Sequence, residues 1–110
     1  MYSRQQGTKL ILNTRKHQFL KKGQIVQVLR TSEQVNEMLL TRKGMSLHRE
    51  NYMLFTTEEN YESLKNVSTH QMYFNRSDFD SIFSTNELAN EFIPYDNKSA
   101  KIVLQKFIED

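Results

Sequence analysis

The chain contains no cysteine, one proline and three glycines in 110 residues. The absence of cysteine excludes disulfides, thiolate metal ligands and a cysteine nucleophile. The three glycines (Gly7, Gly23 and Gly44) are isolated from one another, so the sequence has no glycine-rich loop that would cradle a phosphate. Because Pro94 is the only proline, no rigid proline-rich linker divides the chain.

Long apolar segments are also absent. Uninterrupted apolar runs reach three residues, as in Met53-Leu54-Phe55, which is far short of the roughly 20 residues that span a membrane. The first residues, Met-Tyr-Ser-Arg-Gln-Gln-Gly, carry no apolar signal core and argue against secretion. We therefore expect a cytoplasmic protein without membrane contact.

Aromatic residues are plentiful by comparison. The chain has seven Phe and five Tyr, with 37% hydrophobic and 25% charged residues overall. Aromatic rings bury a large area per residue, and a disordered chain normally lacks them. At this length we expect one compact domain, or two very small lobes that share a core.

Charge divides by sign between Phe55 and Thr56. Residues 1–55 contain ten basic and three acidic side chains, a net charge of +7, whereas residues 56–110 contain five basic and ten acidic ones, a net charge of −5. The whole-chain value of +2 hides this division. Such asymmetry indicates partners rather than fold, because a basic half attracts phosphates or an acidic protein face.

The first half is predicted to form strands. A turn at Lys22-Gly23 precedes a segment rich in β-branched residues, and Arg42-Lys43-Gly44 suits a hairpin connection. The polar residues 31–36 are predicted to be a loop or a single helical turn. The predicted strands are residues 9–12, 24–29, 38–41, 45–48 and 52–55.

Helix-capping signatures dominate the second half. Thr56 stands three residues before Glu59, and Ser84 stands three residues before Glu87, which is the spacing of a capping box. Residues 70–75 are predicted to be a strand because apolar and polar side chains alternate there. The predicted helices are residues 56–65, residues 78–83 after Ser77, residues 86–93 before Pro94, and residues 99–109, of which 101–104 also fit a strand.

These patterns together predict an α+β fold, in which an N-terminal antiparallel small β-barrel or curled sheet is followed by short C-terminal helices. Residues 1–55 are expected to form a basic, β-rich lobe. Residues 56–110 are expected to form an acidic, helical lobe packed on it, within a single compact domain.

The spacing Phe19-x-x-Lys22-Gly23-x-x-Val26-x-Val28 resembles the opening of a Src-homology-3-like small β-barrel. It is also similar to the KOW-type version found in ribosomal and transcription-associated proteins, where a lysine-glycine turn leads into a strand whose alternate residues fill the barrel. Residues 39–54 resemble the central hairpin of such a barrel and the turn into its last strand. The resemblance covers roughly residues 9–55 and implies a small barrel, and its KOW-type form implies contact with nucleic acid.

Basic side chains gather at the predicted turns and strand ends. Loops at one rim of a barrel converge, so some of these charges are expected to contact phosphates with little base specificity, and nearby aromatic rings to stack on bases. Two other interpretations stay open: the charges simply solvate turns and strand edges, or the basic half complements the acidic half of the same chain. The candidate residues for binding nucleic acid or a partner are Lys21, Lys22, Arg30, Arg42, Lys43, His48, Arg49 and Tyr52.

No group of residues predicts catalysis, a metal site or a cofactor. The acids near Glu58 and Asp78 are explained by helix capping and the helix dipole. His17, His48 and His70 lie far apart in the sequence and in no metal-binding spacing, and no serine lies in a nucleophile-elbow context. We therefore expect a protein that is not an enzyme.

An aromatic cluster in the second half has two interpretations. The rings are expected to form core, because a small lobe needs them to bury enough area. One or two exposed rings would instead anchor a partner protein or a second copy. The cluster consists of Tyr73, Phe74, Phe79, Phe83, Phe92, Tyr95 and Phe107.

The sequence thus favours a small non-catalytic nucleic-acid-binding or regulatory protein, of the kind that phages or mobile elements encode, that binds DNA or RNA. The alternative is a protein–protein interaction module that meets an acidic or basic protein surface. Such a module would be an inhibitor or modulator of a host complex, or an assembly subunit that forms oligomers.

Overall fold

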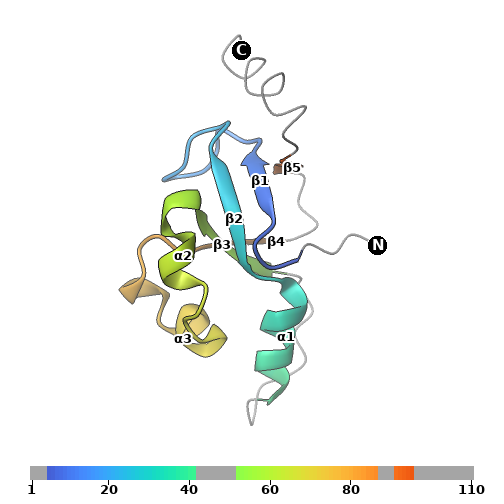
Figure 1. Ribbon diagram of the computed structural model, residues 1–110, viewed down its shortest axis with the longest axis vertical. Helices are drawn as coiled ribbons and strands as arrows, with labels where there is room; N and C mark the ends of the chain where they lie inside the picture. Colours follow the sequence, from blue (N-terminus) through green and yellow to red (C-terminus); the bar gives the residue numbers. More distant parts are fainter. Residues whose placement is uncertain (1–4, 42–51, 87–90, 96–110) are drawn as a thin grey trace.

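The computed structural model describes residues 5–41, 52–86 and 91–95, and its centre is a curled five-stranded antiparallel sheet with short helices on one side (Figure 1). This confirms the predicted α+β fold class. The strands lie in the order β4-β3-β2-β1-β5, so the first four form a meander and β5 returns to pair with β1 at the opposite edge. Their bounds are β1 Lys9–Leu12, β2 Ile25–Arg30, β3 Tyr52–Thr57, β4 Phe83–Asn86 and β5 Phe92–Pro94.

Side-chain contacts show how strongly the sheet curls. The ring of Phe55 on β3 lies 5.8 Å from Phe83 on β4 and 5.1 Å from Phe92 on β5, between ring centroids. The Thr85 hydroxyl on β4 also donates to the carboxylate of Glu91, just before β5, at 2.8 Å. The two edge strands therefore approach each other across the inner face of the sheet.

The sheet buries both of its faces. Alternate side chains of β2 and β3 enter two separate apolar cores, as the two-residue period of a strand requires, and β1 supplies Leu10 and Leu12 to one of them. On β2, for example, Val26 and Val28 lie in the inner core and Leu29 lies in the outer core. The inner core contains Leu10, Leu12, Leu20, Val26, Val28, Met53, Phe55 and Phe92. The outer core contains Leu29, Val35, Leu39, Leu54, Leu64, Met72 and Ile82.

Three short helices supply the apolar side chains that cover the outer core. They are α1 (Ser32–Thr41), α2 (Tyr61–Leu64) and α3 (Thr69–Phe74), with 3₁₀ turns η1 (Glu58–Asn60) and η2 (Arg76–Asp78) beside them. In Figure 1 all three helices lie below the end of the sheet that carries the β1–β2 loop. That loop is therefore left at the surface of the molecule.

Helix α1 corrects two predictions, the loop or single helical turn at residues 31–36 and the strand at residues 38–41. Thr31 and Gln34 form a reciprocal capping box, in which Gln34 N donates to Thr31 Oγ1 at 3.1 Å and Thr31 N donates to Gln34 Oε1 at 2.8 Å. Val35 and Leu39, four residues apart, then enter the outer core together. The predicted hairpin partner, residues 45–48, lies outside the described residues.

The second half contains more strand and less helix than predicted. The predicted strand 70–75 is wrong, because residues 70–74 belong to α3 and Asn75 is its C-cap. Ser68 Oγ accepts from Gln71 N at 3.2 Å and starts this helix, which buries Met72. Predicted helix 78–83 is wrong, because only Asp78 lies in η2, residues 79–82 form no helix, and β4 begins at Phe83. Predicted helix 86–93 begins at the last residue of β4 and ends in β5. β4 pairs with β3 and β5 pairs with β1, and this pairing satisfies backbone groups of the two strands. Predicted helix 99–109 lies outside the described residues.

The predicted helix 56–65 starts later than its capping signature indicates. Strand β3 continues to Thr57, the Thr56 hydroxyl donates to the Ser81 carbonyl at 2.6 Å, and helical structure begins at Glu58. Leu64 is buried, as predicted. The charge boundary between residues 55 and 56 therefore falls inside β3, and both halves of the chain supply strands to one sheet.

Candidate functional site

The loop between β1 and β2, residues 13–24, is closed by backbone hydrogen bonds at its base. Gly23 N donates to the Leu12 carbonyl at 2.8 Å, and Leu12 N donates to the Gln24 carbonyl at 2.9 Å. Gly23 has a φ of +93°, a conformation that side chains with a Cβ rarely adopt. Leu20 is buried in the inner core and anchors the loop from its middle. The loop therefore has a defined shape, although it projects from the sheet.

His17 organises the tip of this loop. Its Nδ1 accepts hydrogen bonds from the backbone N–H groups of Phe19, at 3.1 Å, and Leu20, at 3.0 Å. An imidazole nitrogen that accepts has no proton, so the neutral ring carries its proton on Nε2. The ring also packs edge-on against Phe83, with centroids 5.2 Å apart and planes at 83°. His17 thus fixes the loop backbone and joins it to β4.

Phe19 is the most exposed large apolar side chain in the described part of the chain, at 71% exposure. Its ring centroid lies 6.2 Å from that of Phe83, with the planes tilted by 33°. Phe83 in turn contacts Phe55 of the inner core. Phe19 therefore stands at the outer end of a row of aromatic contacts that reaches the core.

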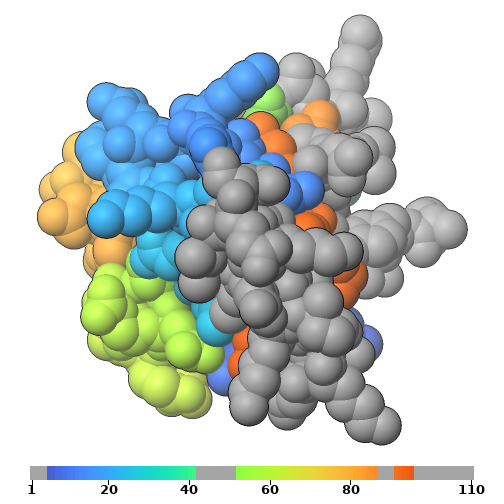
Figure 2. Space-filling view, turned by 90° about the horizontal axis from the view of Figure 1, so that it is seen from above, coloured from blue at the N-terminus to red at the C-terminus, as the bar shows by residue number. Residues whose placement is uncertain are grey.

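Four basic side chains lie in the same loop, and no acidic residue does. Arg15, Lys16 and Lys21 are exposed, and Lys22 is half-buried. Among the described residues, no ion pair joins Arg15, Lys16 or Lys21 to an acid. The blue atoms of this loop project from the surface in Figure 2, which views the molecule from above. Arg15, Lys16 and Lys21 therefore present positive charge that no acid in the described part of the chain pairs with.

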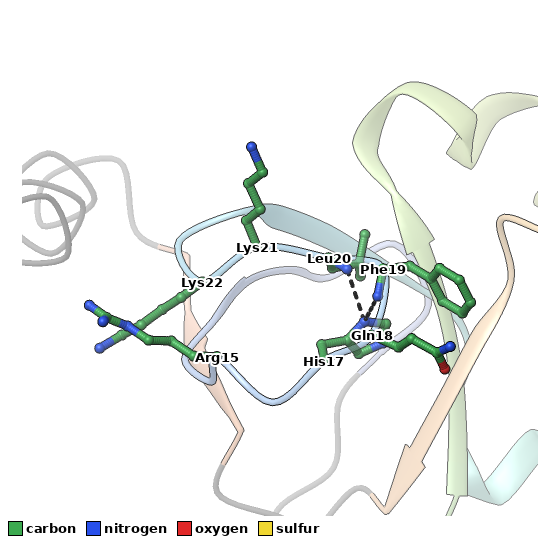
Figure 3. Close-up of a pocket in the computed structure, with 7 residues that line it drawn as sticks. All are labelled: Arg15, His17, Gln18, Phe19, Leu20, Lys21 and Lys22. Atoms are coloured by element: carbon green, nitrogen blue, oxygen red, sulfur yellow. Dashed lines mark hydrogen bonds between the residues drawn. The ribbon is translucent and has the colours of Figure 1, made fainter.

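Arg15 and residues 17–22 border an open hollow of about 470 Å³. Figure 3 shows Arg15 and Lys22 extending to one side of the loop, Lys21 pointing outward, and Phe19 lying on the other side toward β3 and β4. The hollow is thus bordered by cations and by one exposed ring. Such a surface suits an extended anionic ligand rather than a small molecule enclosed in a cavity.

Acidic residues lie beyond the base of the loop. A second hollow, of about 370 Å³, is lined by residues 23–25 and 57–59, which include Glu58 and Glu59. Glu58 pairs with Lys9, Nζ to Oε2, at 2.9 Å, and this carboxylate raises the pKa of the Lys9 amine. The charges of the two halves thus meet at this pair, whereas the loop cations stand farther out.

Of the four predicted binding residues that the structure describes, Lys21 and Lys22 lie together in this loop. Tyr52 is half-buried at the start of β3, and Arg30 is buried at the end of β2. The other four predicted residues, Arg42, Lys43, His48 and Arg49, lie outside the described residues.

Arg30 serves the fold with its guanidinium. It is 8% exposed and donates to the carbonyls of Leu29 at 2.6 Å and Val67 at 2.5 Å, and to the Thr69 hydroxyl at 2.9 Å. Burial lowers the pKa of this guanidinium from its ordinary value. Arg30 therefore joins β2 to the α2–α3 connection and is not part of the candidate surface.

Sequence reasoning missed Arg15, Lys16, His17 and Phe19 as site residues. Residues 1–32 contain no acidic side chain, and within this stretch the basic pairs 15–16 and 21–22 flank His17 and Phe19. That acid-free run was the available signal. In the small-barrel resemblance, however, Phe19 is only the first residue of the spacing that leads through the Lys22-Gly23 turn into a strand.

Most described members of the predicted aromatic cluster contribute to the cores. Phe92 is in the inner core with Phe83 packed against it, and Tyr73 and Phe79 pack on the outer core. Phe74, on α3, is 37% exposed. Phe107 lies outside the described residues.

Within residues 5–41, 52–86 and 91–95, no three His, Asp or Glu side chains gather in an arrangement that would hold a metal ion. No helix in the same ranges has the length and apolar character needed to cross a membrane. Comparison with protein-family models, with curated proteins and with solved structures yields no match to this chain.

Proposed function

We propose that this chain is a small non-catalytic nucleic-acid-binding protein that contacts phosphates through its β1–β2 loop. One observation carries the proposal: an acid-free loop of defined shape places Arg15, Lys21 and Lys22 at the border of an open hollow, with Lys16 exposed in the same loop. Phosphate contacts by such side chains supply most of the affinity in binding that does not depend on sequence. The absence of acids from the loop favours this role, since an interspersed carboxylate would repel the ligand backbone.

The sheet itself supports the choice of the loop. Both of its faces carry apolar cores, so neither presents a flat, open surface to a strand of nucleic acid. The loop projects from the end of the sheet that the helices leave free (Figure 1). A ligand that approaches this end meets cations before it meets Glu58 and Glu59 at the base of the loop.

The test is a salt titration of binding to labelled single- and double-stranded DNA and RNA. We expect log affinity to fall linearly with log salt concentration, with a slope of roughly 0.7–0.9 per phosphate contacted. Changing Arg15, Lys16 and Lys21 together to serine removes three contacts and lowers the slope by about 2 to 3. The variant should fold normally, because these side chains are exposed and lack ion-pair partners among the described residues.

A matched control removes the same charge from elsewhere. Lys9, Lys65 and Arg76 changed together to serine lower the net charge equally but leave the loop intact. The control variant should keep the salt slope of the wild type. The absence of binding at about 50 mM salt, or equal losses in both triple variants, would refute the proposed function.

A protein–protein interaction module is a second candidate function, supported by an exposed aromatic group on α3. Phe74 is 37% exposed and contacts the rings of His70 and Tyr73, each at 4.9 Å between centroids. Such rings are common anchors at protein interfaces. A partner that co-purifies after nuclease treatment, and is lost with Phe74→Ala, would favour this function over the first.

A further inference from the structure

We propose that the β1–β2 loop binds single-stranded nucleic acid, with an unpaired base stacked on Phe19 and adjacent phosphates on Arg15, Lys21 and Lys22. This inference rests on the proposed function and specifies its ligand class. It follows from the placement of Phe19, which the phosphate contacts alone leave unexplained.

The chain holds Phe19 outward although a buried position is next to it. The neighbouring residue Leu20 enters the inner core, and His17 Nδ1 accepts the backbone N–H groups of both residues. These hydrogen bonds fix the backbone on either side of the Phe19 side chain. A ring that is 71% exposed and set on a fixed backbone loses little conformational entropy when a ligand covers it.

The contacts behind Phe19 make it a firm support for a flat ligand. Its ring lies 6.2 Å from Phe83 and 6.4 Å from His17, between centroids, and Phe83 continues the contacts to Phe55 at 5.8 Å. The ring is therefore supported on one side and open on the other. A nucleobase stacks on such a ring regardless of its identity, because every base has a π-face.

The cations around the ring select the class of ligand. An apolar group of a protein partner would need no surrounding positive charge, whereas each base of a nucleic acid brings a phosphate with it. Figure 3 places Phe19 on one side of the loop and Arg15 and Lys22 on the other, so a ligand that uses both must extend across the loop. A strand several nucleotides long has this form, and its bases are unpaired, whereas a duplex hides its base faces inside the stack.

The experiment measures binding of the wild-type chain and its variants to four probes at one salt concentration. The probes are an oligothymidylate and an oligouridylate of about 16 nucleotides, a duplex of equal length, and an abasic deoxyribose-phosphate strand of equal length. We expect both single strands to bind more tightly than the duplex and the abasic strand. The ratio of the two single strands shows whether DNA or RNA is preferred.

Variants of Phe19 test stacking directly. Phe19→Ala should weaken oligothymidylate binding roughly 5- to 150-fold and leave abasic-strand binding unchanged. Phe19→Trp should retain binding, whereas Phe19→Leu, which is apolar but has no ring, should lose as much as the alanine variant. Phe74→Ala, which removes an exposed phenylalanine from α3 at the other end of the molecule in Figure 1, is the matched control and should change nothing.

The outcomes separate this inference from the function on which it rests. Suppose that single strand, duplex and abasic strand bind equally well, with the same salt dependence, and that Phe19→Ala does not change the affinity. That result overturns the inference and leaves phosphate binding in place. If Phe19→Leu binds the oligothymidylate as tightly as the wild type does, the stacking proposal is also overturned. Failure of every probe to bind overturns the proposed function as well.

Discussion

Removal of the Arg30 side chain tests how the helices are attached to the sheet. Its guanidinium donates to the carbonyls of Leu29 and Val67 and to the Thr69 hydroxyl, at 2.5–2.9 Å. Arg30→Ala removes all three bonds and leaves the acceptors in a site that is only 8% exposed in the wild type. The α2–α3 connection then loses its polar attachment to β2.

The size of the effect follows from two opposing terms. Hydrogen bonds from a charged donor are worth about 1.5–3 kcal/mol each, so three contribute roughly 4.5–9 kcal/mol. Burial of the ion costs several kcal/mol, which the alanine variant recovers. The difference predicts a loss of about 2–4 kcal/mol in the free energy of unfolding, or a fall in melting temperature of roughly 10–20 °C.

Urea unfolding followed by circular dichroism measures this loss. The slope of the unfolding free energy against urea concentration should stay unchanged, which shows that the folded state keeps its compactness. Arg30→Lys keeps the charge but cannot reach three acceptors, so it should recover less than half of the loss. Arg76→Ala is the matched control. Its side chain is only half-buried, bonds Ser84 and lies 5.6 Å from the Tyr73 ring, so we expect a loss below about 1 kcal/mol. A loss below about 1 kcal/mol for Arg30→Ala would refute the reasoning.

Three further changes probe separate features. His17→Phe keeps a ring but removes the Nδ1 acceptor, so the backbone amides of Phe19 and Leu20 should exchange hydrogen faster. Unchanged exchange rates would show that His17 does not hold the loop backbone. Thr31→Ala removes the hydroxyl of the α1 capping box and should cost about 1 kcal/mol in urea unfolding, whereas Thr41→Ala, at the exposed end of the same helix, should cost much less. Glu58→Gln should lower the raised pKa of the Lys9 amine in an NMR titration. Because folding raises the pKa of Lys9, the Lys9–Glu58 pair stabilises the fold fully at a pH below the ordinary value of 10.5. This stabilisation is lost as the pH rises through the raised pKa. Glu58→Gln should abolish this pH dependence of stability.

The strands of the first half were predictable because their signals are local. Lys9–Leu12 and most of Ile25–Arg30 have the composition of strands, and the Lys22-Gly23 turn requires a residue that tolerates positive φ. Tyr52–Thr57 was recognised over its first four residues. What could not be read locally was its place beside β2 in the middle of the sheet.

The misassigned segments have patterns that fit two structures. Met38-Leu39-Leu40 is a continuous apolar run, and only the docking of Leu39 into the outer core decides for a helix. Phe92–Pro94 comes after the capping-box spacing of Ser84 and Glu87, which predicted a helix there. The segment instead pairs with β1, which lies near the other end of the sequence. A pairing so distant in sequence leaves no local trace.

The candidate site was partly predictable for the same reason. An excess of positive charge before residue 56 is visible in the sequence, and Lys21 and Lys22 were placed at a turn. The sequence did not distinguish these exposed residues from Arg30, which is buried. The α2–α3 connection buries Arg30 through the hydrogen bonds to Val67 and Thr69. These two residues lie more than thirty-five positions from Arg30 in the sequence. It also did not show that Phe19 faces outward while Leu20 faces inward.

The order of strands in the sheet constrains the order in which the chain can fold during synthesis. Strand β1 is made first, but its outer edge is completed only by β5, and Phe92 of β5 belongs to the inner core. Until the ribosome has released residues 92–94, the nascent chain has an open strand edge and an unfilled core beside it. The sheet is therefore expected to close late, with a chaperone able to bind the β1 edge in the interval.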